Sequence, residues 1–154
     1  MQVGDAVGGY QESKFFEPGT DLTIAKTPFG NIGLMVCYDL RFPELALSLR
    51  AQGANILTAP AAFTYTTGEM HWQFLLQARA MDSQCQVLGA AQQGWHGEKR
   101  QTWGHAGAAN SRGQLLDIIH EEGAGLITVP FDLAEQQLVR ASMPLMQHRV
   151  LLQY

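Results

Sequence analysis

The sequence predicts an α/β domain in which helices cover a largely buried sheet. Apolar segments of strand length alternate with segments of helical periodicity between residues 22 and 92, and turns separate further strand-like segments after residue 105. Strands that alternate with helices are typical of layered α/β proteins. The stretch at residues 55–63 is mostly apolar, which indicates a strand buried on both faces. With 154 residues, the chain suits one domain, residues 1–154, with a substantial core.

The first part of the chain predicts a loop followed by two strands. Residues 1–20 hold four glycines and no helical or strand period, which is typical of a long loop. Residues 22–27 and 31–37 are short stretches rich in apolar residues, and a turn with proline and glycine at residues 28–31 separates them. This pattern predicts two short strands joined by a hairpin-like turn.

Two helices are predicted, one on each side of the strand at residues 55–63. The first shows an apolar stripe at i, i+3, i+4 and i+7, begins at Pro43 and stops at Gly53. In the second, Thr66 and Glu69 have the spacing of a capping box. The inner face of this helix is expected to hold Trp72, Leu75, Leu76, Arg79 and Ala80.

The second half of the chain predicts a buried strand, a β-meander and a last helix. Residues 85–92 are mostly apolar and predict another buried strand. Residues 105–131 predict strands joined by turns at residues 111–113 and 122–123. Residues 132–143 predict a short helix, which the following proline ends.

Composition excludes several classes of function. Hydrophobic residues make up 46% and charged residues 16%, which is ordinary for a soluble globular protein. A net charge of −4 argues against nucleic acid or an anionic membrane as partner. No apolar run approaches the roughly 18 residues of a membrane span, and residues 1–10 lack the pattern of a signal peptide. The two cysteines lie in different segments and form no CxxC pair, so we expect a reducing, cytoplasmic location.

Cys37 stands where a buried strand is expected to end and a helix to begin. A side chain at that place projects from the carboxyl edge of the sheet, where backbone N–H groups point toward a developing oxyanion. The helix N-terminus is expected to lower the pKa of the Cys37 thiol, which favours the reactive thiolate. The alternative interpretation is a small buried hydrophobic residue, the usual role of a cysteine outside disulfides.

The residues around Cys37 resemble the nitrilase superfamily of carbon–nitrogen hydrolases. The similarity is carried by "GLMVCYDLRFPELALSLRAQGANILTAPAAFT", "TGEMHWQFLLQARAMDSQC" and "TWGHAGAANSRGQLL", and it extends from about Glu12 to Arg149. Within the superfamily, the chain is most similar to the Nit branch, which includes deaminated-glutathione amidases and omega-amidases. The resemblance implies a four-layer α-β-β-α sandwich, here without its N-terminal strands and helices, so that residues 1–154 form a partial domain.

The resemblance also implies a chemistry and a set of site residues. Members of the family use a Glu–Lys–Cys triad without metal or organic cofactor, and Cys37 matches the nucleophile, which forms a thioester with the acyl group. The backbone N–H of Tyr38 matches the oxyanion donor, and Glu12 matches a second, accessory glutamate. The implied substrate is a small carboxylate-bearing amide such as deaminated glutathione.

The triad glutamate and lysine have no counterparts at the expected places. In the family both precede the cysteine, and the lysine lies upstream of the accessory glutamate, where this chain has no basic residue. Lys14 follows Glu12 and is therefore expected to be a solvated loop charge. Two functions stay open: an amidase of the Nit type, and an inactive remnant or non-catalytic partner subunit.

Several other residues have both a functional and a structural interpretation. His71 and His105 could each serve a Cys–His hydrolase as base, but a structural role is expected because neither is a general base in this family. The histidines show no paired spacing for zinc. Asp39 and Arg41 flank the nucleophile and could shape either the turn or the pocket.

The remaining candidates are expected to be mainly structural. Glu69 is expected to be a helix cap, Cys85 to lie in the core, and Arg79 to form a buried ion pair with Asp82 or Asp39. Phe63 and Thr64 end a strand at the sheet edge where open α/β sheets bind ligands, and they are candidates for the substrate wall.

The C-terminal residues predict assembly into a homo-oligomer. Val150, Leu151, Leu152 and Tyr154 are too apolar for a solvated chain end and suit the covering of another surface. The resemblance supports this expectation, because family members pair through the region of the nucleophile's helix and the C-terminal segment. Without its upstream strands, the sheet is expected to expose an edge that favours aggregation.

Overall fold

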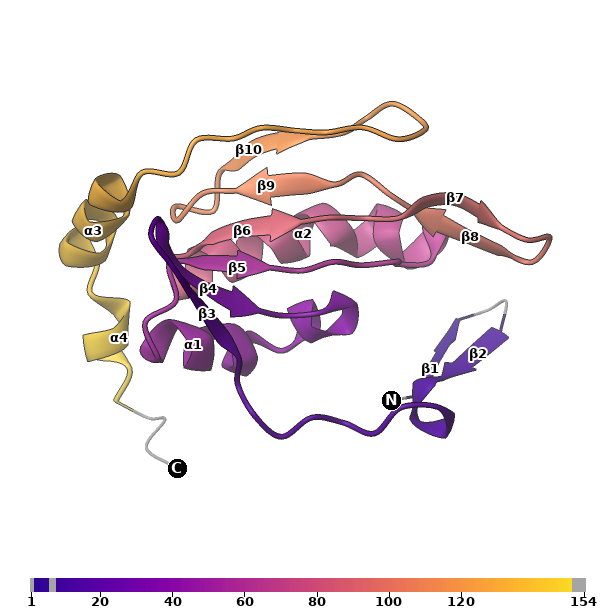
Figure 1. Cartoon of the computed structure of the whole chain (residues 1–154), viewed down its shortest axis with the longest axis horizontal. Coiled ribbons are helices and arrows are strands. Elements are labelled where there is room, and N and C mark those ends of the chain that lie inside the picture. The colour runs from indigo at the N-terminus through magenta and orange to yellow at the C-terminus, as the bar shows by residue number, and fades with distance from the viewer. Residues whose placement is uncertain (1, 6–7, 151–154) are drawn as a thin grey trace.

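A computed structural model describes the backbone of residues 2–5 and 8–150 and the side chains of residues 13–150. Its centre is a six-stranded sheet with the order β10-β9-β6-β5-β4-β3 (Figure 1). The strands are β3 (Ile24–Thr27), β4 (Gly30–Leu34), β5 (Ile56–Thr58), β6 (Gln86–Gly89), β9 (Gly107–Ala109) and β10 (Leu115–Ile118). Strands β4, β5 and β6 are parallel, and the other pairs are antiparallel.

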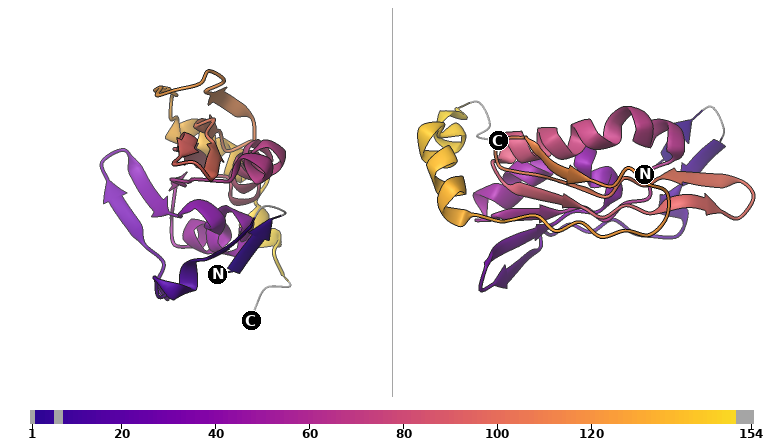
Figure 2. Two further views of the ribbon diagram at one scale, coloured as in Figure 1. Left: turned by 90° about the vertical axis from the view of Figure 1, so that its right-hand side faces the viewer. Right: turned by 90° about the horizontal axis from the view of Figure 1, so that it is seen from above.

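Helices α1 (Pro43–Ala51) and α2 (Tyr65–Ser83) connect the three parallel strands and pack on one face of the sheet (Figure 2). Side chains of the central strands that face these helices are fully buried, as Leu57 and Val87 are. Leu49, Trp72 and Leu76 cover them from the helices. This core holds the carboxyl ends of the parallel strands in place, and the candidate site lies there.

The opposite face of the sheet is apolar and only partly covered. Leu34 is 44% exposed and Val36, which follows β4, is 60% exposed. The described residues therefore form one helical layer and one sheet layer. This arrangement agrees with the mixed α/β class that the sequence predicts. Among the described residues, no helix is long and apolar enough to cross a membrane.

The N-terminal segment contains a hairpin where the sequence predicts only a loop. Strands β1 (Gln2–Asp5) and β2 (Gly8–Gln11) pair with each other, and a 3-10 turn, Glu12–Lys14, follows. The glycines of both strands hid the alternation of side chains that signals a strand. Beyond this turn, residues 15–23 contain no helix or strand.

The second half differs from expectation in two places. A hairpin of β7 (Gln93–His96) and β8 (Arg100–Trp103) was not predicted, because its polar residues and glycines resemble a loop. After β10, residues 119–131 form no strand, although one was predicted beyond the turn at residues 122–123. Leu126 in this segment is 92% exposed, so its apolar side chain has no neighbour that would favour a strand.

The helix boundaries are partly as predicted. The capping box of Thr66 and Glu69 was wrong, because Thr64 precedes the first residue of α2 and an exposed Glu69 lies within the helix. Helix α3 (Leu133–Ser142) lies where a helix was predicted, and the Asp132 side chain accepts a hydrogen bond from the Glu135 N–H (3.0 Å). A further short helix, α4 (Leu145–His148), follows.

Candidate active site

Cys37 lies at the carboxyl edge of the sheet, one turn after β4. Beyond the end of β4, the Met35 N–H donates to the Thr58 carbonyl (3.0 Å) and the Cys37 N–H donates to the Pro60 carbonyl (2.9 Å). These bonds extend the parallel pairing of β4 with the β5 segment up to the cysteine itself. The backbone of Cys37 is therefore fixed to the sheet, as the sequence predicts for a residue at a strand end.

The Cys37 backbone has a left-handed conformation, with φ at +48°. Residues with a Cβ rarely adopt this conformation, and strained residues of this kind cluster at functional sites. The conformation reverses the chain, so that the 3-10 helix Cys37–Arg41 starts at once and precedes α1. In α/β-hydrolases, a nucleophile on a sharp turn between a strand and a helix is presented at the top of the sheet.

Asp39 braces this turn. Its Oδ2 accepts a hydrogen bond from the Val36 N–H (2.9 Å), and its own N–H donates to the Val36 carbonyl (3.0 Å). The Asp39 carbonyl then accepts from the Phe42 N–H (3.0 Å). Of the two roles that the sequence left open for Asp39, these contacts favour shaping the turn. Of the two partners expected for Arg79, Asp82 forms the ion pair and Asp39 does not.

The Tyr38 N–H is a donor in the first turn of the 3-10 helix. First-turn N–H groups have no acceptor within their own helix. The neighbouring donors are committed elsewhere, since the Cys37 N–H bonds to Pro60 and the Asp39 N–H to Val36. The Tyr38 N–H thus belongs to the part of the turn where an oxyanion donor is expected, and this role stays a prediction.

Arg41, at the end of the same 3-10 helix, places a cation beside the turn that begins at Cys37. Its guanidinium carbon lies 5.5 Å from the centre of the Tyr38 ring and 5.3 Å from that of the Phe63 ring. Both terminal nitrogens lie 3.3 Å from His71 Nδ1, which must accept because a guanidinium only donates. Among the described residues, no carboxylate forms a salt bridge with Arg41.

The two predicted wall residues lie at the same edge of the sheet. Phe63 is 7% exposed, and its ring packs edge-on against Trp72 at 5.3 Å. Thr64 precedes α2, and its Oγ1 lies 2.9 Å from Thr67 Oγ1. Phe63 thus contributes to the core as well as to the contact with Arg41. The substrate contacts of both residues stay predictions.

Among the acidic and basic candidates upstream of Cys37, those with described side chains are exposed. Glu12 begins a 3-10 turn, but its side chain lies outside the described residues. Lys14 is exposed, as expected, and the other two lysines of the chain, Lys26 and Lys99, are exposed as well. The glutamates with described side chains are also all exposed.

The second cysteine and the buried arginine have the structural roles that were predicted. Cys85 is fully buried, and burial raises the pKa of its thiol. Arg140 Nη2 donates to the Cys85 sulfur (3.4 Å), which links α3 to the core. Arg79 pairs with Asp82 at 2.9 Å. In the described part of the chain, no group of three or more histidine, cysteine, aspartate or glutamate residues could hold a metal ion.

Sequence comparison places the chain among carbon–nitrogen hydrolases. The model of the family described as "Carbon-nitrogen hydrolase" matches residues 5–141. The chain is 45% identical over 148 residues to the deaminated glutathione amidase of Yersinia enterocolitica, covering 96% of this chain and 51% of that protein. It is 46% identical over 143 residues to the deaminated glutathione amidase of Mus musculus, covering 92% of this chain and 44% of that protein. The chain thus spans about half the length of these relatives.

Solved structures show the same relationship. The NitFhit protein of C. elegans matches with a TM-score of 0.84 at 37% identity, covering 97% of this chain and 37% of that one. Nit3 of Saccharomyces cerevisiae, a member of branch 10 of the nitrilase superfamily, matches with a TM-score of 0.81 at 30% identity, covering 95% of this chain and 56% of that one. The fold around Cys37 is therefore a nitrilase-superfamily fold.

Proposed function

Because this chain belongs to the carbon–nitrogen hydrolase family, in the Nit branch of the nitrilase superfamily, we propose that it carries the nucleophile of an amidase. In this proposal, residues 1–154 form the nucleophile-bearing part of one hydrolase domain. The observation that carries the proposal is the turn at Cys37, which combines a left-handed backbone conformation with fixation to the sheet edge.

The proposed reaction is acyl transfer through a thioester. A base takes the Cys37 thiol proton, and the thiolate attacks the amide carbonyl carbon to form a C–S bond. The C–N bond then breaks, and the departing nitrogen takes the proton from the base, so that an amine or ammonia leaves. Water next attacks the thioester carbonyl, which releases the carboxylic acid and restores the thiol.

The 3-10 turn supplies the proposed stabilisation of the oxyanion. The carbonyl oxygen becomes negative when sulfur attacks, and a backbone N–H that points at it is worth about 10²–10³ in rate. The Tyr38 N–H is the donor that we assign to this role. The 3-10 helix offers the Tyr38 N–H no acceptor. The hydrogen bond from the Val36 N–H to the Asp39 carboxylate stabilises the turn that holds this donor.

The contacts of Arg41 support the proposal that the substrate carries a carboxylate. Its guanidinium is held by His71 and two aromatic rings, with no carboxylate in salt-bridge contact among the described residues. Arginine binds carboxylates through paired hydrogen bonds. We therefore propose a small carboxylate-bearing amide as substrate, and deaminated glutathione is the candidate, since the relatives named above act on it.

The same structure supports a competing function, an inactive remnant or a non-catalytic partner. All three lysines are exposed, which disfavours a role for any of them as a fixed cation at an oxyanion site. Every described glutamate is exposed too. In the amidase proposal, the base and the ammonium therefore come from outside residues 13–150.

A chimera distinguishes these two functions. The chain would be joined to the part of the Yersinia enterocolitica relative that it does not cover, and tested on deaminated glutathione with hydroxylamine present. Hydroxylamine intercepts a thioester and gives a hydroxamate of the acyl group. The amidase proposal predicts hydroxamate from the chimera and none from its Cys37→Ala variant. A folded chimera that forms no hydroxamate would favour the non-catalytic function.

A further inference from the structure

The Arg41 guanidinium is bound by His71 at one edge only. Both terminal nitrogens of Arg41 lie 3.3 Å from His71 Nδ1. A guanidinium can offer a pair of N–H groups either between its terminal nitrogens or between Nε and one terminal nitrogen, and His71 occupies the first of these edges. Arg41 Nε makes no hydrogen bond to a described residue, and it is not among the described buried nitrogens that lack a partner. The Nε edge is therefore accessible to a ligand.

Two aromatic rings restrict the guanidinium but do not choose this edge. The guanidinium carbon of Arg41 lies 5.5 Å from the centre of the Tyr38 ring and 5.3 Å from that of the Phe63 ring. Phe63 is anchored in the fold, because its carbonyl accepts from the Trp103 N–H of β8 (3.0 Å). An aromatic ring attracts a cation through its face as a whole, whereas a hydrogen bond has a direction. His71 is therefore the contact that sets which edge of the guanidinium stays open.

His71 is a fixed acceptor. It lies in α2 next to Trp72, which is 1% exposed and donates its indole N–H to the His105 carbonyl (2.6 Å). This contact anchors α2 at the turn that holds His71. A guanidinium only donates, so Nδ1 of His71 carries the lone pair and the neutral ring has its hydrogen on Nε2. The neutral form of His71 is thus the one that holds Arg41.

No described carboxylate competes for the open edge of Arg41. Asp39, the acidic residue nearest to it in the sequence, accepts the hydrogen bond from the Val36 N–H (2.9 Å). Neither of the salt bridges in the described part of the chain involves Arg41. A half-buried arginine with one open pair of N–H groups suits a planar anion, because a carboxylate accepts two parallel hydrogen bonds from such a pair.

We propose that His71 is a positioning residue, whose Nδ1 fixes the Arg41 guanidinium so that its Nε edge binds the carboxylate of the substrate. The inference rests on the proposed amidase function, in which Arg41 binds that carboxylate. It adds the residue that orients Arg41 and the edge of the guanidinium that is used. In this role His71 acts through Arg41 and not as the base for Cys37.

Alkylation of Cys37 by a matched pair of reagents tests this role without turnover. N-iodoacetylglycine carries a carboxylate about 5 Å from the carbon that the sulfur attacks, and N-iodoacetylglycinamide carries a neutral amide there. Arg41 ends the 3-10 helix that Cys37 begins, about 8 Å further along the axis, so the carboxylate spans most of this distance. Both reagents react with the same thiolate, so the ratio of their rates cancels any change in the ionisation of Cys37.

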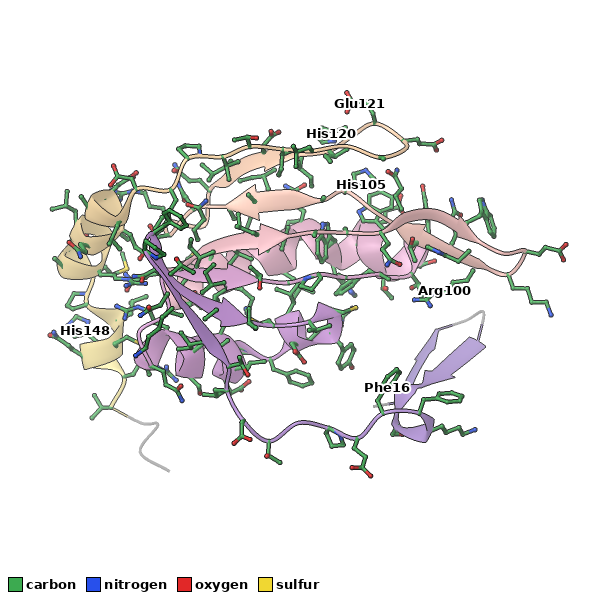
Figure 3. All side chains as sticks on the ribbon, in the orientation of Figure 1. Phe16, Arg100, His105, His120, Glu121 and His148 are labelled. Carbon is green, nitrogen blue, oxygen red and sulfur yellow. The ribbon has the colours of Figure 1, made fainter. Side chains whose placement is uncertain are left out.

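The 154-residue chain and its variants would be treated with each reagent at low salt, and the rate at Cys37 followed by peptide mapping. We expect Arg41→Gln and His71→Ala each to lower the ratio of the anionic to the neutral rate about 2- to 5-fold. His71→Asn should keep the ratio, because its Cγ carries an acceptor oxygen where histidine carries Nδ1. The control His148→Ala removes an imidazole on α4, at the end of the molecule opposite the β7–β8 hairpin, and should leave the ratio unchanged (Figure 3).

A double variant separates positioning from a purely structural role. If His71 acts through Arg41, His71→Ala adds nothing to the effect of Arg41→Gln on the ratio. A general loss of packing would instead change the rates of both reagents together. The proposal is overturned by an unchanged ratio in His71→Ala, by an equal loss in His71→Asn, or by additive effects in the double variant.

The outcomes also separate this inference from the proposed function. If the ratio depends on Arg41 and His71 while the chimera forms no hydroxamate, the positioning role stands and the amidase proposal fails. If the chimera forms hydroxamate and the ratio is the same in all variants, the amidase proposal stands and the positioning role fails.

Discussion

Selective alkylation is the first prediction, because the two cysteines of this chain lie in opposite environments. Cys85 is fully buried, its sulfur donates to the Ala54 carbonyl (3.3 Å), and burial raises the pKa of its thiol. Cys37 is half-buried at a chain reversal on the sheet edge. Iodoacetamide reacts with the thiolate, so both access and ionisation favour Cys37.

The expected ratio of the two alkylation rates follows from the free energy needed to expose the buried Cys85 side chain. Global unfolding of a domain costs about 5–15 kcal/mol, and local opening costs less. If exposing Cys85 costs about 3 kcal/mol, its reaction slows about 100-fold, since about 1.4 kcal/mol corresponds to a factor of ten. The raised pKa of Cys85 lowers its thiolate fraction and slows it further.

The assay is limited treatment with iodoacetamide at neutral pH, followed by peptide mapping with mass spectrometry. We expect label on Cys37 at least about 100-fold faster than on Cys85. The single variants Cys37→Ala and Cys85→Ala give the rate of each remaining thiol. Equal rates, or faster labelling of Cys85, would refute the assignment of Cys37 as the reactive thiol.

Three further predictions concern stability and are measured by chemical or thermal unfolding. Asp39→Ala removes the carboxylate that braces the turn at Cys37, and we expect the free energy of unfolding to fall by about 0.5–1.5 kcal/mol. An added Cβ at Gly68 would overlap the Trp103 side chain, so Gly68→Ala is expected to lower the free energy of unfolding by about 1–3 kcal/mol. The control is Gly19→Ala, whose Cβ meets no neighbour within 4 Å and which should leave the stability nearly unchanged. Burial raises the pKa of the Cys85 thiol in the folded state. Above the ordinary pKa of a thiol, the unfolded chain therefore loses this proton first, and the free energy of unfolding falls as pH rises. Cys85→Ala should reduce that slope, and an unchanged slope would exclude Cys85 as its source.

Much of the fold was predictable because hydrophobic periodicity marks the helices and strands, and glycine and proline residues mark the turns between them. The apolar run that ends at Cys37, the helix that begins at Pro43 and the buried strand near Leu57 follow from local pattern. The N-terminal hairpin and the β7–β8 hairpin were missed because their glycines and polar residues mask the alternation of a strand. The strand expected near Leu126 did not form, since a strand needs a partner and an apolar surface to cover.

The sequence indicated where the candidate site lies but not its geometry. The order of residue types placed Cys37 at a strand end, yet its left-handed backbone is visible only in the structure. The contact of Arg41 with His71 joins residues 30 positions apart, and no local pattern encodes it. His105 was weighed as a base, and a structural role was expected for it. Its stacking on Trp103 depends on the unpredicted β7–β8 hairpin.

The rate of amide hydrolysis by the 154-residue chain itself tests the central claim most directly. Deaminated glutathione would be incubated with the chain, with its Cys37→Ala variant and with the chimera described above, and the release of cysteinylglycine followed. The account predicts that the chain alone stays at the background rate, and that the chimera turns over in a Cys37-dependent way. One oxyanion donor typically contributes about 10²–10³ in rate, and all three lysines of the chain are exposed. Turnover by the chain alone that Cys37→Ala abolishes would contradict the claim that the base and the ammonium come from elsewhere.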